Sequence, residues 1–158
     1  MSEVEFYSHQ LLASLVSEGK PEELSRQGHT LTRAAQVLAA VGQEIAARMS
    51  RVAWEGEAAE AFRAWGRHFG EQSSVLGEYA YTVGEAMLRA GTALREAQSA
   101  MPPPPPSVLS TEASATPLDE ITAETDRQEA IRVAERLVST YQVAADLMQS
   151  AEEPRFQP

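Results

Sequence analysis

Apolar residues recur every three or four positions along most of this chain, a spacing typical of amphipathic α-helices. The first such stretch covers residues 5–18, and Pro21 is well placed to open the next one. The second stretch covers residues 21–53 and has an apolar stripe made of Leu24, Leu31, Leu38, Val41, Ile45, Met49 and Val52. Gly28 and Gly42 weaken this stretch without breaking its pattern, so we expect a short helix followed by a long one.

The longest periodic stretch covers residues 57–101 and carries an apolar seam like that of a coiled coil. The seam consists of Phe62, Phe69, Leu76, Ala80, Val83, Met87, Ala90, Leu94, Ala97 and Met101. A helix of this length would extend over about 65 Å. Two long helices joined by a short corner predict an elongated hairpin, and residues 1–101 are expected to form this hairpin module.

A break in the pattern follows the hairpin module. The proline run at residues 102–106 ends the third helix, because proline lacks the amide hydrogen that a helix requires. This run and the Ser/Thr/Ala-rich residues after it predict a linker over residues 102–117. A last periodic stretch at residues 118–152 predicts a helix that packs on the hairpin, and residues 153–158 are expected to form an unstructured tail. The predicted fold is all-α, with about four helices.

Four glycines recur every seven residues in the third helix, namely Gly70, Gly77, Gly84 and Gly91. Each costs about 1 kcal/mol relative to alanine, so a neighbouring helix that packs closely along this edge would have to compensate. That neighbour is either another helix of the same chain or a helix of a bound partner. In the second case the partner-binding surface comprises Phe69, Gly70, Leu76, Gly77, Ala80, Val83, Gly84, Met87, Gly91 and Leu94.

The corner between the two long helices has the sequence Trp54-Glu55-Gly56. Glycine allows a sharp turn, and an indole offers a large apolar face together with one hydrogen-bond donor. The tryptophan is either a hydrophobic plug that fixes the turn or a surface that another protein recognises. The corner therefore favours recognition over catalysis as the function to consider.

The composition excludes several classes of partner. A formal charge of −10 and an isoelectric point near 4.8 argue against nucleic acids and anionic membranes, which attract basic surfaces. The chain has no cysteine, which rules out disulfide bonds and thiolate metal sites. Its apolar runs are far shorter than the roughly 20 residues of a membrane-spanning helix, and its acidic N-terminal residues do not predict a general signal peptide.

Residues with catalytic or metal-binding chemistry do not gather into a recognisable motif. His9, His29 and His68 stand on separate segments, and a di-metal helical bundle requires paired Glu-x-x-His turns. A Gly-x-Ser-x-Gly nucleophile motif and a phosphate-binding glycine loop are also missing from the sequence. We therefore expect no catalytic residues, no metal site and no cofactor.

Several segments together resemble the substrates of type VII secretion, namely the small WXG-type proteins and the PPE-type proteins of actinobacteria. These are a helix that starts after Pro21, the corner followed by Ala-Ala-Glu-Ala-Phe at residues 58–62, and a long helix that reaches Met101 just before a proline run. The Pro-Pro-Glu element that names the PPE family is replaced by Pro-Glu-Glu at residues 21–23. The resemblance implies a helical hairpin that pairs with a PE-type or WXG-type helical hairpin as a heterodimer.

The resemblance also implies an export signal. In such pairs the Trp-x-Gly corner lies beside a Tyr-x-x-x-Asp/Glu element, and Trp54 and Gly56 match the corner. Tyr81 and Glu85 match the spacing of the acidic element, although they lie inside the third helix. Either these two residues or a partner supplies the acidic half of the signal.

The expected function is therefore that of a non-enzymatic substrate or partner of a type VII secretion system. Such a protein is synthesised in the cytoplasm and then secreted or held at the cell envelope, without stable insertion in a membrane. Its partners would be a PE-like or WXG-type protein, the secretion machinery and a toxin or other effector. Two alternatives remain, a cytosolic adaptor or chaperone for a toxin, and a self-assembling helical structural protein.

Overall fold

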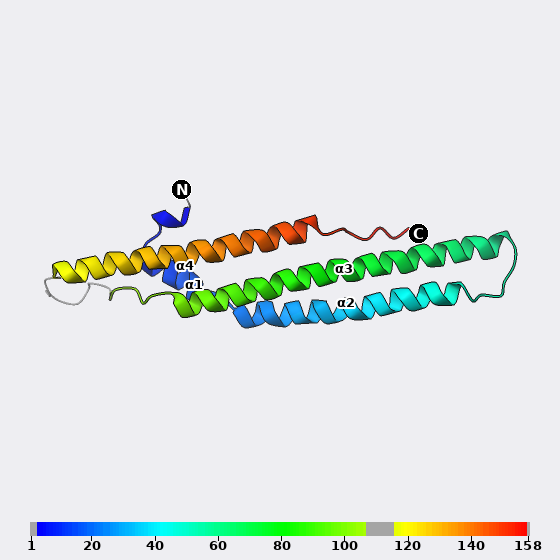
Figure 1. Ribbon diagram of the computed structural model, residues 1–158, viewed down its shortest axis with the longest axis horizontal. Helices are drawn as coiled ribbons and strands as arrows, with labels where there is room; N and C mark the ends of the chain where they lie inside the picture. The colour runs from blue at the N-terminus through cyan, green and yellow to red at the C-terminus, as the bar shows by residue number, and fades with distance from the viewer. Residues whose placement is uncertain (1–2, 107–115, 158) are drawn as a thin grey trace. The chain divides into compact units, whose positions relative to one another are not determined.

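The computed structural model describes residues 3–106 and 116–157, and most of these residues are helical (Figure 1). A 3₁₀ turn at Glu3–Phe6 precedes four α-helices, which are α1 (His9–Glu18), α2 (Pro21–Met49), α3 (Glu57–Ala100) and α4 (Pro117–Ser150). Within these described ranges all regular structure is helical, so the predicted all-α fold is confirmed. Most of the predicted linker after residue 106 lies outside the described residues.

Local capping groups explain where the helices begin. Helix α1 starts at His9 and not near residue 5, because the side chain of Ser8 accepts a hydrogen bond from the backbone N–H of Leu11. At the start of α4, Thr116 and Asp119 cap each other, with the Asp119 carboxylate accepting from the Thr116 hydroxyl at 2.6 Å and from its backbone N–H at 2.9 Å. These two hydrogen bonds hold the pKa of the Asp119 carboxyl below its ordinary value.

The end of α2 differs from the sequence-based expectation. The helix ends at Met49, where the chain was expected to stay helical to residue 53. Ser50 and Arg51 form a turn in which the Arg51 N–H donates to the Arg48 carbonyl at 3.0 Å, tightening the last turn. Residues 52–56 then cross to α3 as a loop that has no regular structure.

The chain divides into two compact units, and this division cuts through the long helices. One unit contains Met1–Glu23 and Arg89–Val143, and the other contains Leu24–Leu88 and Ala144–Pro158. The sequence-based boundaries at residues 101 and 117 follow the helices instead of these units. The candidate site described below lies in the second unit.

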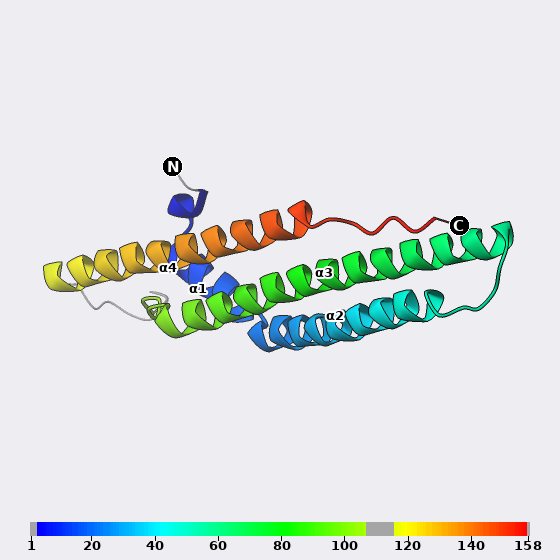
Figure 2. The same cartoon turned by 45° about the vertical axis from the view of Figure 1, so that its right-hand side comes forward.

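In the second unit α2 and α3 run antiparallel and side by side, as both Figure 1 and Figure 2 show. Their backbones meet at small residues that step by seven along each helix. A Cβ atom added to Gly28 would lie 2.8 Å from the Gly84 carbonyl oxygen, and one added to Gly42 would lie 2.8 Å from the Gly70 carbonyl oxygen. Between these pairs Ala35 faces Gly77, so the contact continues along the hairpin.

The larger apolar residues of α2 flank this contact. Leu31, Leu38 and Ile45 are half-buried, as expected for a stripe beside the helix interface. The prediction that Val41 belongs to the buried stripe is wrong, because this side chain is 45% exposed and Gly42 takes the interface position. The buried face of α2 is thus made of Gly28, Ala35 and Gly42.

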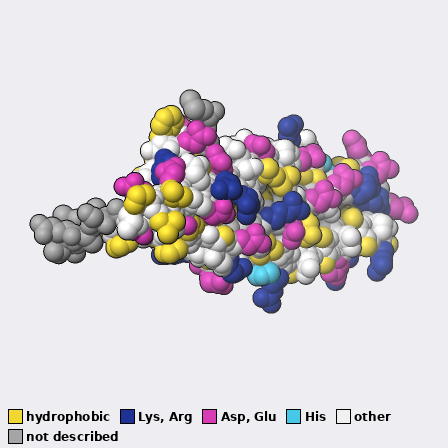
Figure 3. Space-filling view, turned by 60° about the vertical axis from the view of Figure 1, so that its left-hand side comes forward, with side chains coloured by type: hydrophobic (Ala, Val, Ile, Leu, Met, Phe, Trp, Pro, Cys, Tyr) yellow, Lys and Arg dark blue, Asp and Glu magenta, His cyan; other side chains and the backbone are white. Residues whose placement is uncertain are grey.

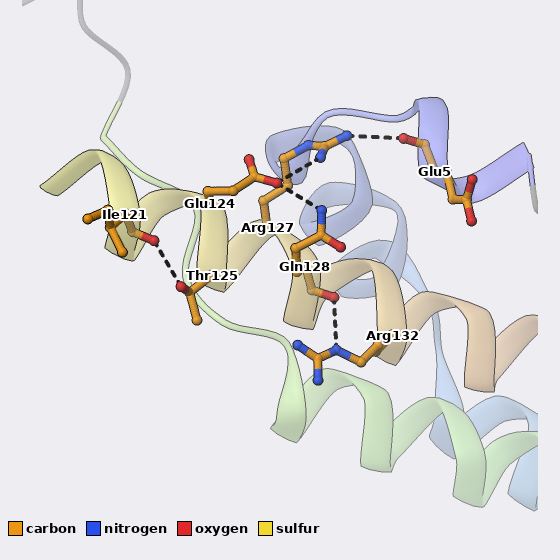
Figure 4. Close-up of polar contacts among 7 residues, drawn as sticks. All are labelled: Glu5, Ile121, Glu124, Thr125, Arg127, Gln128 and Arg132. Carbon is orange, nitrogen blue, oxygen red and sulfur yellow. Dashed lines mark hydrogen bonds and ion pairs between the residues drawn. The ribbon is translucent and has the colours of Figure 1, made fainter. Parts of the chain in front are cut away.

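In the first unit α1 packs against parts of α3 and α4 through small and branched side chains. One cluster contains Val4, Leu12, Ala130, Ile131 and Ala134, and a second contains Val16, Ala97 and Val133. The Gln98 amide donates to the carbonyls of Val16 and Gly19 at 3.0 and 2.8 Å, which satisfies the end of α1. Arg127 of α4 donates to the Glu5 carbonyl at 3.0 Å and thereby joins the 3₁₀ turn to α4 (Figure 4).

Candidate functional site

The corner between α2 and α3 has a backbone that only glycine adopts readily. Gly56 has a φ of 101°, a region that other residues rarely occupy, and a Cβ added there would meet nothing within 4 Å. Its carbonyl accepts from the N–H groups of Ala59 and Glu60 at 3.0 and 3.1 Å, which starts α3. Gly56 is therefore required by the conformation of the corner and not by crowding around it.

An arginine on the second turn of α3 holds this corner in place. The guanidinium of Arg63 donates to the carbonyl of Val52 at 3.1 Å and also to the carbonyl of Trp54. Because one planar group binds two carbonyls of the same loop, it fixes the direction in which Trp54 leaves the backbone. Sequence reasoning missed Arg63, since a contact across nine or more residues of an irregular loop leaves no periodic signal.

Trp54 begins a series of aromatic contacts that we call the aromatic row, consisting of Trp54, Phe62, Trp65 and Phe69. Ring centroids lie 6.1 Å apart for Trp54 and Phe62, 5.9 Å for Phe62 and Trp65, and 5.4 Å for Trp65 and Phe69. These distances are those of favourable aromatic pairs. The three rings on α3 are spaced by three and four residues, which places them on one face of the helix. This spacing was visible in the sequence, but sequence reasoning missed Trp65.

The aromatic row is largely uncovered. Trp54 is 51% exposed, Trp65 is 44% exposed and Phe62 is 39% exposed. Phe62, which was expected in the apolar seam of α3, is thus not covered by α2. The reason is that α2 ends at Met49, whose side chain packs over Gly66, so α2 does not reach the first turns of α3.

The glycine edge of α3 packs against α2 of the same chain. Gly70, Gly77 and Gly84 each approach the α2 backbone too closely to admit a further helix without displacing α2. Among the other residues expected to bind a partner, Ala80, Gly91 and Leu94 are buried, whereas Phe69, Leu76, Val83 and Met87 are half-buried. Of the two explanations for the glycine repeat, packing within the chain thus describes Gly70, Gly77 and Gly84.

Tyr81 and Glu85 lie one helical turn apart in the middle of α3. Tyr81 is 51% exposed and lines a groove of about 500 Å³ between α2 and α3, together with Ala35, Gln36, Ala39, Gln43, Ser74, Gly77, Glu78 and Thr82. Glu85 is half-buried. Between Glu57 and Tyr81 the helix rises about 36 Å, so the chain does not place its own Tyr81 and Glu85 beside Trp54 and Gly56.

The segment after α4 also reaches α3, although it was expected to be unstructured. The Arg155 backbone N–H donates to the side-chain oxygen of Gln72 at 2.6 Å, and its carbonyl accepts from Nε2 of His68 at 3.2 Å. The ring of Phe156 lies 5.4 Å from that of Phe69. Residues 154–157 are therefore held on α3 at one end of the aromatic row.

Residues 3–106 and 116–157 contain no group of three or more His, Asp or Glu side chains placed to hold a metal ion. In the same part of the chain, none of the helices combines the length and the apolar character needed to cross a membrane.

No protein-family model and no curated protein sequence matches this chain.

Proposed function

We propose that this chain is a non-enzymatic helical protein that pairs with a second helical hairpin and presents Trp54 and Gly56 as part of an export signal for type VII secretion. The observation that carries this proposal is the state of Trp54. Its ring is half exposed, yet its backbone is fixed by the Gly56 turn and by Arg63. An aromatic side chain that is held in place but left uncovered is suited to recognition by another protein.

The exposure of Trp54 favours recognition over the plug explanation. A tryptophan that serves only to fix a turn would bury most of its ring against the helices that it joins. Here Trp54 contacts the ring of Phe62, which is itself 39% exposed. Both rings thus present apolar surface to solvent at the corner, which supports a role in binding.

A partner is the better source of the acidic half of the export signal. Tyr81 lies about 36 Å along α3 from its first residue and Glu85 lies a turn further, too far for either to join Trp54 in one composite surface. We therefore assign the Tyr-x-x-x-Asp/Glu element beside the corner to a PE-type or WXG-type partner. Tyr81 and Glu85 remain candidates for contact with the partner elsewhere along α3.

The outer face of α2 is the best-placed surface for pairing with a partner helix. The glycine edge of α3 is filled by α2, whereas Val37 and Val41 of α2 are 63% and 45% exposed. With the exposed Ala34 they follow the spacing of three and four residues that helix packing requires. This stripe would bury apolar surface only when another helix covers it.

The charge of the chain suits a protein partner. On the face drawn in Figure 3, acidic, basic and apolar side chains are interspersed, and the net charge of the whole chain is −10. A nucleic acid would require a continuous basic surface. Mixed charge around apolar positions is typical of the polar rim of a protein interface.

Secretion of the chain tests this proposal. The chain is co-expressed with the helical proteins encoded by neighbouring genes, in strains with and without a working type VII ATPase. Trp54→Ala is compared with Trp65→Ala, which removes the other tryptophan of the chain at a similar exposure. We expect the wild type and Trp65→Ala to reach the medium only when the ATPase works, and Trp54→Ala to stay in the cell with its partner still bound.

Two results would contradict the export signal. Equal secretion of Trp54→Ala and wild type would show that the corner is not read by the machinery. A wild-type chain that stays in the cytosol while bound to a neighbouring toxin would favour the adaptor function instead.

A further inference from the structure

Residues 154–157 lie on α3 in a way that resembles a bound peptide. One residue of the segment, Arg155, uses both of its backbone polar groups, donating to Gln72 and accepting from His68. The two side chains that bind it are one helical turn apart on α3, at i and i+4. The next residue of the segment, Phe156, places its ring against that of Phe69, which lies between His68 and Gln72 in the sequence.

In this set of contacts, the backbone hydrogen bonds provide affinity and the ring contact provides selectivity. Hydrogen bonds to backbone groups hold any extended segment, because every residue except proline carries the same N–H and C=O groups. The ring contact selects an aromatic side chain at the following position, since Phe69 offers a ring face at a centroid distance of 5.4 Å. The site therefore recognises an extended segment with an aromatic residue and does not require the sequence of this chain.

The site is open to exchange of its occupant. Phe156 remains 44% exposed while bound, and both hydrogen bonds of Arg155 are accessible to solvent. The aromatic row continues from Phe69 through Trp65 towards Trp54, with rings that the chain's own segment does not cover. A longer or more aromatic segment would thus find contacts in addition to those that Phe156 makes.

We propose that His68, Phe69 and Gln72 form a peptide-binding site on α3, which residues 154–157 fill and which an extended, aromatic-bearing segment of a partner protein occupies in their place. This occupant is an extended segment and not a helix, so the inference stands apart from the pairing and export proposed above. Residues 154–157 then act as an internal competitor that keeps the site closed until the partner segment displaces them.

A full-length variant with an empty site tests the proposal. Arg155→Pro removes the N–H that binds Gln72, and Phe156→Ala removes the ring that contacts Phe69. The probe is a fluorescent peptide with the sequence of residues 151–157, and its anisotropy reports binding. We expect the double variant to bind this peptide at least about tenfold more tightly than the wild type, because an attached competitor acts at a local concentration on the order of millimolar.

Three controls make the result specific. Phe6→Ala removes another exposed phenylalanine, 76% exposed in the 3₁₀ turn, and should bind the peptide as weakly as the wild type does. Gln72→Ala in the double variant should weaken binding, and so should a peptide with alanine in place of the phenylalanine. Circular dichroism of each variant checks that the helices are intact.

Three results would contradict the proposal. Failure of the peptide to bind the folded double variant, or equal affinity for the double variant and the wild type, would overturn the proposal. A wild-type dimer that becomes a monomer in the double variant would show that the occupant is the same segment of a second copy, and the partner assignment would then be wrong.

Discussion

Single residues fix the conformation of the corner, and only some of them can be identified from the sequence. The step Trp54-Glu55-Gly56 predicted a turn that needs glycine, and Gly56 indeed has a φ of 101°. The exposure of Trp54 could not be predicted, because it depends on where α2 ends and on the clamp that Arg63 forms. Arg63 was missed because its function depends on the path of an irregular loop.

Gly56→Ala tests the corner at this scale. A Cβ added there meets nothing within 4 Å, so the cost comes from the backbone alone. A positive φ for a non-glycine residue costs about 1–2 kcal/mol, and we expect the free energy of unfolding to fall by that amount. Urea denaturation followed by circular dichroism measures it.

The neighbouring substitution Glu55→Ala is the control for this prediction, because Glu55 is exposed and lies in the same corner. It should leave the free energy of unfolding within about 0.5 kcal/mol of the wild-type value. A Gly56→Ala protein as stable as the wild type would mean that the corner adopts another backbone conformation.

At the scale of elements, a repeat of small residues on each helix sets the hairpin. The seven-residue spacing of the α3 glycines indicates a close helix contact, whereas by the apolar pattern alone Gly28 and Gly42 of α2 only weaken their helix. With Ala35 between them they have the same spacing, and the structure pairs each with a small residue of α3. The small residues of both helices, and not the leucines alone, therefore carry the signal for the contact and its register.

Whether alanine substitutions at the interface of α2 and α3 raise or lower the free energy of unfolding tests this pairing. Without a packing role, Gly28→Ala would raise the free energy of unfolding by about 1 kcal/mol, because alanine favours the helix. A Cβ at Gly28 would instead lie 2.8 Å from the Gly84 carbonyl oxygen, so we expect a loss of about 1–3 kcal/mol. Gly77→Ala should lower the free energy of unfolding by less, because its Cβ would lie 3.1 Å from the Ala35 carbonyl oxygen.

The exposed position Ala34 provides the reference for helix propensity. Ala34→Gly should lower the free energy of unfolding by about 1 kcal/mol, because it changes only the propensity of α2. If Gly28→Ala stabilised the protein by a similar amount, the close approach of α2 and α3 would be contradicted.

Across the whole molecule, the buried apolar positions are mostly small. In the described residues none of the large side chains is fully buried, and the core is rich in alanine. Large side chains such as Leu15, Val37, Trp54 and Leu118 are more than half exposed. A chain that buries so little large apolar surface by itself is suited to gain stability from a partner that covers it.

At the scale of the whole molecule, the sequence predicted the fold class and the order of the helices but not the contacts between distant segments. The all-α fold and the order of the helices followed from strong periodicity, which long amphipathic segments display plainly. The division into two units and the contact of Phe156 with Phe69 join residues far apart in sequence, so no local pattern reported them.

Pairing with a second helical protein is the claim on which the proposed function depends. The most direct measurement is the mass, by light scattering, of the purified chain co-expressed with each neighbouring helical protein. We predict a stable complex with one copy of each chain, from which Val37→Glu with Val41→Glu releases the partner, because these charges would enter a dry helix interface. A chain that remains alone beside every neighbour, or a complex that the double substitution does not weaken, would contradict the account.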